Sequence, residues 1–173
     1  MNYLRLTILI SLIAIVGCSE QKSLPTKHWF KGNLHTHSYW SDGDEFPEVI
    51  MDWYKSNDYQ FVALTDHNTL AEGAKWKVIR KDSIYQDAFK SYLDNYGSSQ
   101  VNYKTDSLNK IHVKLKTYEE YKGQFEEIGK FLIIQSEEIS DHFGSKPLHL
   151  NAHNIQKKIH PQGGNSVLEV LQN

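Results

Sequence analysis

The stretch from Gln60 to Asn68, QFVALTDHN, decides how this chain is expected to fold. Its first six residues indicate a short buried strand, and the polar residues Asp66, His67 and Asn68 follow at once. α/β proteins place ligands and catalysts where an apolar strand ends, because the loops at the carboxyl ends of parallel strands are free to vary. We therefore expect an α/β fold with a mainly parallel sheet or barrel, and a functional site beyond this strand.

Strand-like and helical segments alternate on both sides of this stretch, as they do in α/β proteins. Pro47 is expected to open a helix, and Thr69 to cap another that runs through Ala74, Trp76 and Ile79. The remaining expected elements are a strand within 28–37, the helix 47–57, a helix over 118–130, a buried strand over 131–135, a strand over 148–155 and a helix beginning at 166–171. Residues 81–116 are rich in Tyr, Ser, Asn and Asp and are interpreted as an insertion with weak helical periodicity around 84–96.

Composition favours one globular domain and argues against a nucleic-acid partner. With 173 residues, 39% of them hydrophobic, the chain can bury a real core. Its formal charge of -2 comes with mixed signs and no basic stripe, so no nucleic-acid binding is expected. The nine histidines cluster with Asp, Glu and Asn in short stretches, which points to metal chemistry.

The first residues are typical of an exported lipoprotein. A short polar start with Arg5 precedes the apolar run 6–16, which is too short for a comfortable membrane span. The ending Ile15-Val16-Gly17-Cys18 resembles a bacterial lipobox. We expect a signal peptide at 1–17, lipid modification of Cys18, a flexible tether at 18–27 and a folded domain at 28–173. This places the protein in the bacterial cell envelope, anchored by lipid to the membrane; an uncleaved anchor or a buried core helix is the alternative.

Four short stretches carry residues suited to metal binding. On a strand, His35 and His37 would present two imidazoles on one face, with Asp42 in the loop beyond. An isolated His-x-His is more often the polar side of a half-exposed strand, but Asp66 and His67 form a second stretch of this kind. A capping role for Asp66 is the alternative there.

The third and fourth stretches lie later in the chain. Glu137 and Glu138 adjoin the strand 131–135, and only one of two adjacent strand residues can point inward. If residues 148–155 are extended, His149, Asn151 and His153 share one face. A surface strand with its polar side in water is the alternative for this segment.

Together, residues 31–43, 64–68, 136–140 and 147–155 resemble the four motifs of the polymerase and histidinol phosphatase (PHP) family. The resemblance implies the N-terminal portion of a distorted (β/α)7 barrel, incomplete at its C-terminus. It also implies hydrolysis of a small-molecule phosphate ester by two or three divalent ions, usually zinc, manganese or iron. Ser136 departs from the family pattern, which has Gly there, and the family's later ligands, a histidine and an Asp-x-His pair, are not found before Asn173.

The resemblance also implies a role for each residue. His35 and His37 would bind a first metal, His149 a second, and Glu138 would bridge two metals. Asp42 and His67 would serve a third metal. Asp66, counted with His67 as catalytic, would not bind a metal itself but would orient the side chains that do. The second-choice ligands are Glu137 and His153, with His160 as a weaker substitute.

Two other functions stay open at this point. One is a non-catalytic, envelope-anchored metal-binding module whose site is structural or vestigial. The other is a metal-dependent amidohydrolase on a similar barrel, a class that also opens with His-x-His. That class typically needs a lysine on a later strand, and no lysine follows the strand 131–135 in the place of Glu138.

Overall fold

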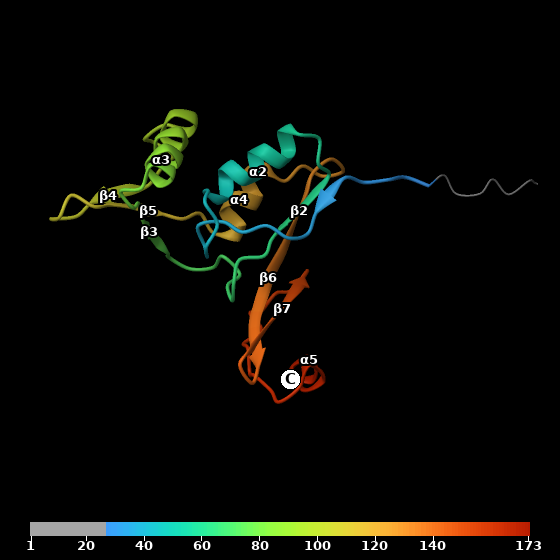
Figure 1. The fold of residues 1–173 in the computed structure, drawn as a ribbon. Coiled ribbons are helices and arrows are strands. Elements are labelled where there is room, and N and C mark those ends of the chain that lie inside the picture. Colours follow the sequence, from blue (N-terminus) through green and yellow to red (C-terminus); the bar gives the residue numbers. More distant parts are fainter. Residues whose placement is uncertain (1–26) are drawn as a thin grey trace, which may run out of the picture.

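The structure is a computed structural model, and it describes residues 27–173 (Figure 1). It contains two sheets. The main sheet has the order β1-β2-β6-β7, and the smaller one the order β3-β5-β4. The strands are β1 (Gly32–Asn33), β2 (Phe61–Leu64), β3 (Trp76–Val78), β4 (Tyr103–Thr105), β5 (Ile111–Lys114), β6 (Leu132–Phe143) and β7 (Lys146–His153). The helices are α2 (Pro47–Ser56), α3 (Ser83–Tyr96), α4 (Tyr118–Phe125) and α5 (Val167–Gln172).

The main sheet confirms a mixed α/β architecture. Strands β1, β2 and β6 run parallel, and β7 returns antiparallel beside β6 as a hairpin. The sheet is curled and open like half of a barrel. The main sheet is thus mainly parallel, as expected, and β7 is the exception because residues 144–145 leave room only for a tight reversal between β6 and β7.

Several predicted elements are confirmed. Helix α2 begins at Pro47, β2 lies within the predicted buried strand, and α5 begins after the Ser166 cap. Helix α4 begins at Tyr118, as predicted, after a capping box between Thr117 and Glu120, but it ends at Phe125 rather than 130. It ends early because the chain turns back on itself through a bridge between Glu127 and Phe131.

The predicted helix after Thr69 is wrong. Asn68, Ala71 and Gly73 have positive φ angles, which a right-handed helix does not allow. Residues 76–78 instead form β3, whose alternating side chains pair antiparallel with β5. Trp76, Lys77 and Val78 alternate between apolar and polar side chains, which is the two-residue period of a strand. This pattern decides the local structure, and the helical spacing of Ala74 and Ile79 does not.

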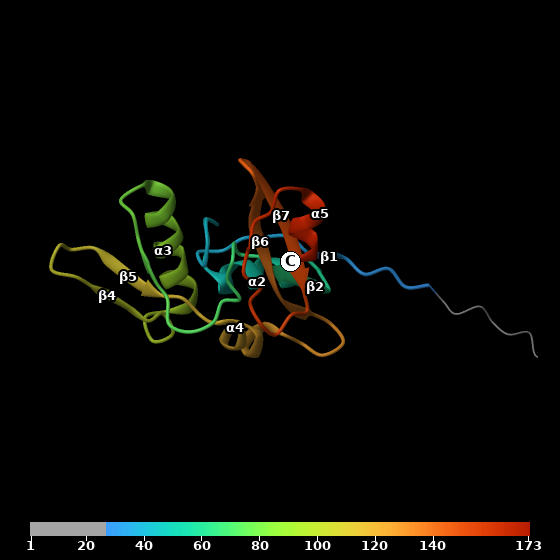
Figure 2. The ribbon, with the colours of Figure 1, turned by 90° about the horizontal axis from the view of Figure 1, so that it is seen from below.

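The segment interpreted as an insertion forms a lobe beside the main sheet, seen in both Figure 1 and Figure 2. It contains α3 and the β4–β5 hairpin, and β3 completes its sheet. Aromatic packing joins the lobe to the core: the Phe46 ring stacks on Tyr92 with centroids 4.1 Å apart, and Tyr39 stacks on Tyr85 at 5.5 Å. These stacked rings fix the loop between β1 and α2 against helix α3.

No helix within residues 27–173 is long and apolar enough to cross a bilayer. The predicted signal peptide, the predicted lipid attachment at Cys18 and the tether up to residue 26 lie outside the described residues.

Candidate metal centre

The first two histidines follow β1 and do not lie on it. The prediction of a strand under His35 and His37 is wrong in that respect, since β1 covers only Gly32–Asn33. The segment nevertheless stays extended, because the Thr65 amide donates to the Thr36 carbonyl at 2.8 Å. The two imidazoles therefore keep the same-side arrangement, with their Nε2 atoms 3.2 Å apart.

Glu138 lies in the middle of a strand that extends beyond the predicted end at residue 135. Strand β6 runs on to Phe143 because its second half pairs with β7. The residues after β2 continue alongside it: the Asn68 amide donates to the Glu138 carbonyl at 3.0 Å, and the Glu138 amide to the Asp66 carbonyl at 3.3 Å. This pairing sets His67 beside Glu138.

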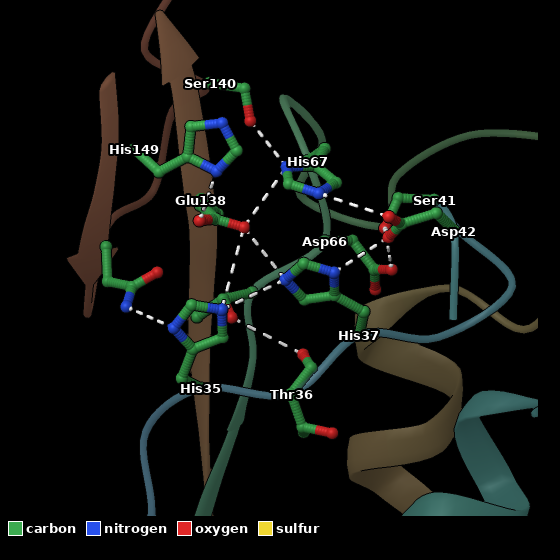
Figure 3. A network of polar contacts seen from close by, with 12 residues as sticks. His35, Thr36, His37, Ser41, Asp42, Asp66, His67, Glu138, Ser140 and His149 are labelled. Carbon is green, nitrogen blue, oxygen red and sulfur yellow. Dashed lines mark hydrogen bonds and ion pairs between the residues drawn. The ribbon is translucent and has the colours of Figure 1, made fainter. Parts of the chain in front are cut away.

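Only one of the adjacent glutamates faces this site, as predicted. Glu138 is buried and points toward the histidines (Figure 3). Glu137 is buried on the other face of β6, where it accepts a hydrogen bond from the Ile159 amide at 2.5 Å. The structure therefore does not bring Glu137, a second-choice ligand, to the site.

One group of three possible ligands is formed by His35, His37 and Glu138. Glu138 Oε2 lies 2.9 Å from His37 Nε2 and 3.7 Å from His35 Nε2. Ligand atoms about 2.0–2.1 Å from a tetrahedral zinc ion are about 3.3 Å from one another. The spacing in this group therefore suits a shared cation.

Two further groups adjoin the first. One contains His37, Asp42 and His67, and the other His67, Glu138 and His149. Asp42 lies 2.8 Å from His37 Nδ1 and 3.4 Å from His67 Nε2, through different carboxylate oxygens. Glu138 Oε1 lies 2.9 Å from His149 Nδ1, while Oε2 lies 3.1 Å from His67 Nδ1. All six predicted first-choice ligands thus meet at one place.

Glu138 Oε2 is the most informative atom of the cluster. It is buried and has no hydrogen-bond partner among the described residues, although three imidazole nitrogens approach it. A buried carboxylate oxygen without a donor is costly. A cation between the carboxylate and the imidazoles would remove this cost.

Asp66 holds the loop that carries Asp42. Its Oδ1 accepts from the Ser38 amide at 2.8 Å and the Ser41 hydroxyl at 2.7 Å, and its Oδ2 accepts from the Ser38 hydroxyl at 2.7 Å. A Cβ at Gly43 would lie 2.5 Å from the His37 carbonyl carbon, so this tight loop needs glycine there. The buried Asp66 carboxylate faces the loop and takes no part in the three ligand groups, so the geometry agrees with an orienting role.

Sequence reasoning assigned no role to two polar neighbours of the histidines. The carboxamide of Asn151 lies 2.8 Å from His35 Nδ1, and the Ser140 hydroxyl lies 2.5 Å from His67 Nδ1. Asn151 could have been found from its alternation with His149 and His153, because the predicted shared face of β7 does meet the site. Ser140 stands two residues after Glu138, and only the extension of β6 reveals that it faces the same way.

The weaker candidates lie outside the three groups. His153 Nδ1 is 3.0 Å from the Ser136 hydroxyl, and burial together with the nearby His35 lowers the pKa of His153. His160 is exposed in the segment between β7 and α5. The structure therefore makes neither a member of the cluster.

Electrostatics keep Asp42 in its ligating form. The hydrogen bond from His37 is the main cause that holds the pKa of Asp42 below its usual range, and the charge of His67 adds to this effect. A low pKa means that Asp42 is a carboxylate at neutral pH. Donors from imidazole and carboxylate together suit zinc, manganese or iron.

Comparison with the family models, the curated proteins and the solved structures finds no match to this chain.

Proposed function

We propose that the chain is a metal-dependent phosphoesterase of the PHP type, whose described residues form the N-terminal portion of a distorted (β/α)7 barrel. The observation that carries the proposal is that His35, His37 and His149, from segments far apart in sequence, converge on the buried carboxylate of Glu138 (Figure 3). The order of these segments along the chain is that of the family motifs. A small-molecule phosphate ester is the proposed substrate.

The residues present fit a centre of two divalent ions, and a third ion would need the later ligands that the family supplies. His37, His67 and Glu138 are each shared by two of the three groups, so six residues serve all three. A catalytic metal site typically combines three protein ligands with an open position. The two oxygens of Glu138 face different groups, so this carboxylate can bridge neighbouring ions. Such ions, when bound, lower the pKa of water toward neutrality and offset the charge of a phosphoryl group.

The protein's own part is to hold these ligands and to leave the site open to substrate. Glu138 is buried, whereas the side chains of His35 and His149 are about half exposed, so the cluster is reached from one side. Asp66 fixes the loop bearing Asp42 through Ser38 and Ser41. Fixed ligands require little rearrangement during the reaction, which is the main protein contribution to this kind of catalysis.

Loss of a central ligand tests this function. In the chain loaded with manganese or zinc, His35→Ala should lower the bound metal and reduce hydrolysis of a generic phosphomonoester at least about 10-fold, as loss of a ligand contact does. The matched control is His142→Ala, whose exposed imidazole lies outside the ligand groups. Metal is measured by elemental analysis, and unchanged metal content in His35→Ala would contradict the site.

The same measurements separate the other functions. A binding module would hold at most one ion tightly and hydrolyse neither ester nor amide. An amidohydrolase would hydrolyse amides in preference to phosphate esters. Two or three ions per chain together with phosphomonoester hydrolysis support the phosphoesterase.

We also propose that the protein is anchored in the bacterial cell envelope by lipid on Cys18, after removal of residues 1–17. This proposal is supported by the apolar run 6–16 and the lipobox-like residues 15–18.

A further inference from the structure

The end of the main sheet opposite the ligand groups carries an apolar groove. It lies at the starts of β2 and β6, whereas the ligand groups lie beyond the end of β2 and along the second half of β6. Phe30 forms one wall, just before β1. The rest of the lining is Gln60, Phe61, Gly129, Lys130, Phe131 and Leu132.

Large apolar side chains around this groove are exposed to an unusual degree. Of the lining residues, Phe30 is 69% and Leu132 52% exposed, and their neighbours in the chain, Trp29 before Phe30 and Ile128 before Gly129, are 92% and 98% exposed. Single exposed apolar residues are ordinary, but a gathering of them marks an interaction surface. We name these four residues the apolar rim.

Charge and composition indicate a membrane surface as the occupant. Lys31, Lys55 and Lys130 lie at this end, and Lys27 shortly precedes Trp29 in sequence; the carboxylates there are Asp58, Glu126 and Glu127. Glu127 is already paired with Lys55 and Lys130. Tryptophan, phenylalanine and aliphatic side chains flanked by lysine are the composition with which proteins enter the interface of an anionic bilayer.

Chain length supports the same occupant. Cys18 precedes Lys27 by nine residues, which span at most about 30 Å when fully extended. Lys27 and His28 are followed by Trp29 and Phe30, and the chain enters the sheet from this end (Figure 1). A lipid on Cys18 would therefore keep the apolar rim close to the bilayer.

We propose that the apolar rim docks on the membrane interface, with Trp29 and Ile128 inserted among the lipid headgroups. The inference rests on the proposed lipid anchor. In this orientation the ligand groups face away from the bilayer. The site is then presented to soluble phosphate esters and not to lipid headgroups.

Quenching of tryptophan fluorescence tests the docking. The lipid-modified full chain is reconstituted in phosphatidylethanolamine–phosphatidylglycerol vesicles that carry bromine near the headgroup end of the acyl chains. We expect quenching in the unmodified sequence and loss of most of it in Trp29→Phe. Trp53→Phe is the matched control, because Trp53 is also exposed but lies on α2, outside the groove.

Flotation of the vesicles distinguishes the two proposals. Cys18→Ser should fail to float with the vesicles while the unmodified sequence floats. If both chains stay in the soluble fraction, the lipid anchor fails and the docking fails with it. If the chain floats and Trp29 is not quenched, or if quenching depends on Trp53, the anchor stands and the docking is overturned. A protein segment that fills the groove would give this same unquenched result.

Discussion

Asn151 shows how a single neighbour can set the form of a metal ligand. An imidazole that binds metal through Nε2 carries its proton on Nδ1, and that proton needs an acceptor. The Asn151 carboxamide is 2.8 Å from His35 Nδ1, and either end of an amide can be turned toward it. Its oxygen would hold His35 with Nε2 directed at Glu138 and His37.

Replacing this carboxamide is therefore expected to weaken metal binding without removing a ligand. Asn151→Leu should lower the affinity for zinc or manganese roughly 10- to 100-fold. Asn151→Asp, which keeps an acceptor, should retain most of the affinity. Titration with a competing chelator gives the affinity. Equal losses in both variants would show that Asn151 serves only to pack β7.

At the scale of elements, the sequence predicts best where local pattern decides the structure. The apolar run of β2 and the proline at the start of α2 each act within a few residues, and both were predicted. The length of β6 was not, because it depends on pairing with β7. The helix expected after Thr69 failed for the same reason, since pairing with β5 decides β3.

In the candidate site, too, local patterns were predictable and long-range contacts were not. The ligand types were readable from the four motifs. Strand alternation predicted that only one of Glu137 and Glu138 faces the site, and the family resemblance indicated Glu138. The contacts of Ser140 with His67 and of Asp66 with Ser38 join residues 73 and 28 positions apart. Contacts over such separations follow from the topology of the sheet, which no local pattern specifies.

The contact between α2 and α3 gives a prediction about stability. Glu48 is buried on α2, accepts a hydrogen bond from the Tyr92 hydroxyl on α3, and leaves Oε2 without a partner among the described residues. Burial raises the pKa of Glu48 above its ordinary value of 4.5. The protonated form is thus favoured by folding, so stability from this group is full below pH 4.5 and is lost as the pH rises through the folded-state pKa.

Glu48→Gln should therefore raise the melting temperature at pH 7 and leave it nearly unchanged at pH 4. A gain of about 1 kcal/mol would correspond to roughly 2–4 °C in a chain of this size. Thermal unfolding followed by circular dichroism at the two pH values measures this. Tyr92→Phe serves as the opposite control and should cost about 1–3 kcal/mol, because it leaves Glu48 Oε1 unpaired as well. A gain from Glu48→Gln that is equal at both pH values would contradict the burial argument.

At the scale of the whole molecule, the ligand groups join four segments of the fold at one place. Ligands come from the loop after β1, the loop after β2, the middle of β6 and the β7 strand at the edge of the sheet. When no cation is bound between them, the close approach of these imidazoles and carboxylates contributes least to the stability of the folded chain. Ion binding should consequently stabilise the folded chain as a whole.

This coupling makes the melting temperature a measure of metal binding. At a free metal concentration of about 100 times the dissociation constant, a single ion adds about 2.7 kcal/mol, or roughly 5–10 °C here. A chelator should remove the gain. His149→Ala should reduce it, because the third group then loses its ligand from β7, whereas His142→Ala should retain it in full. A melting temperature of the unmodified chain that is indifferent to zinc, manganese and chelator alike would mean that the six residues meet without binding an ion.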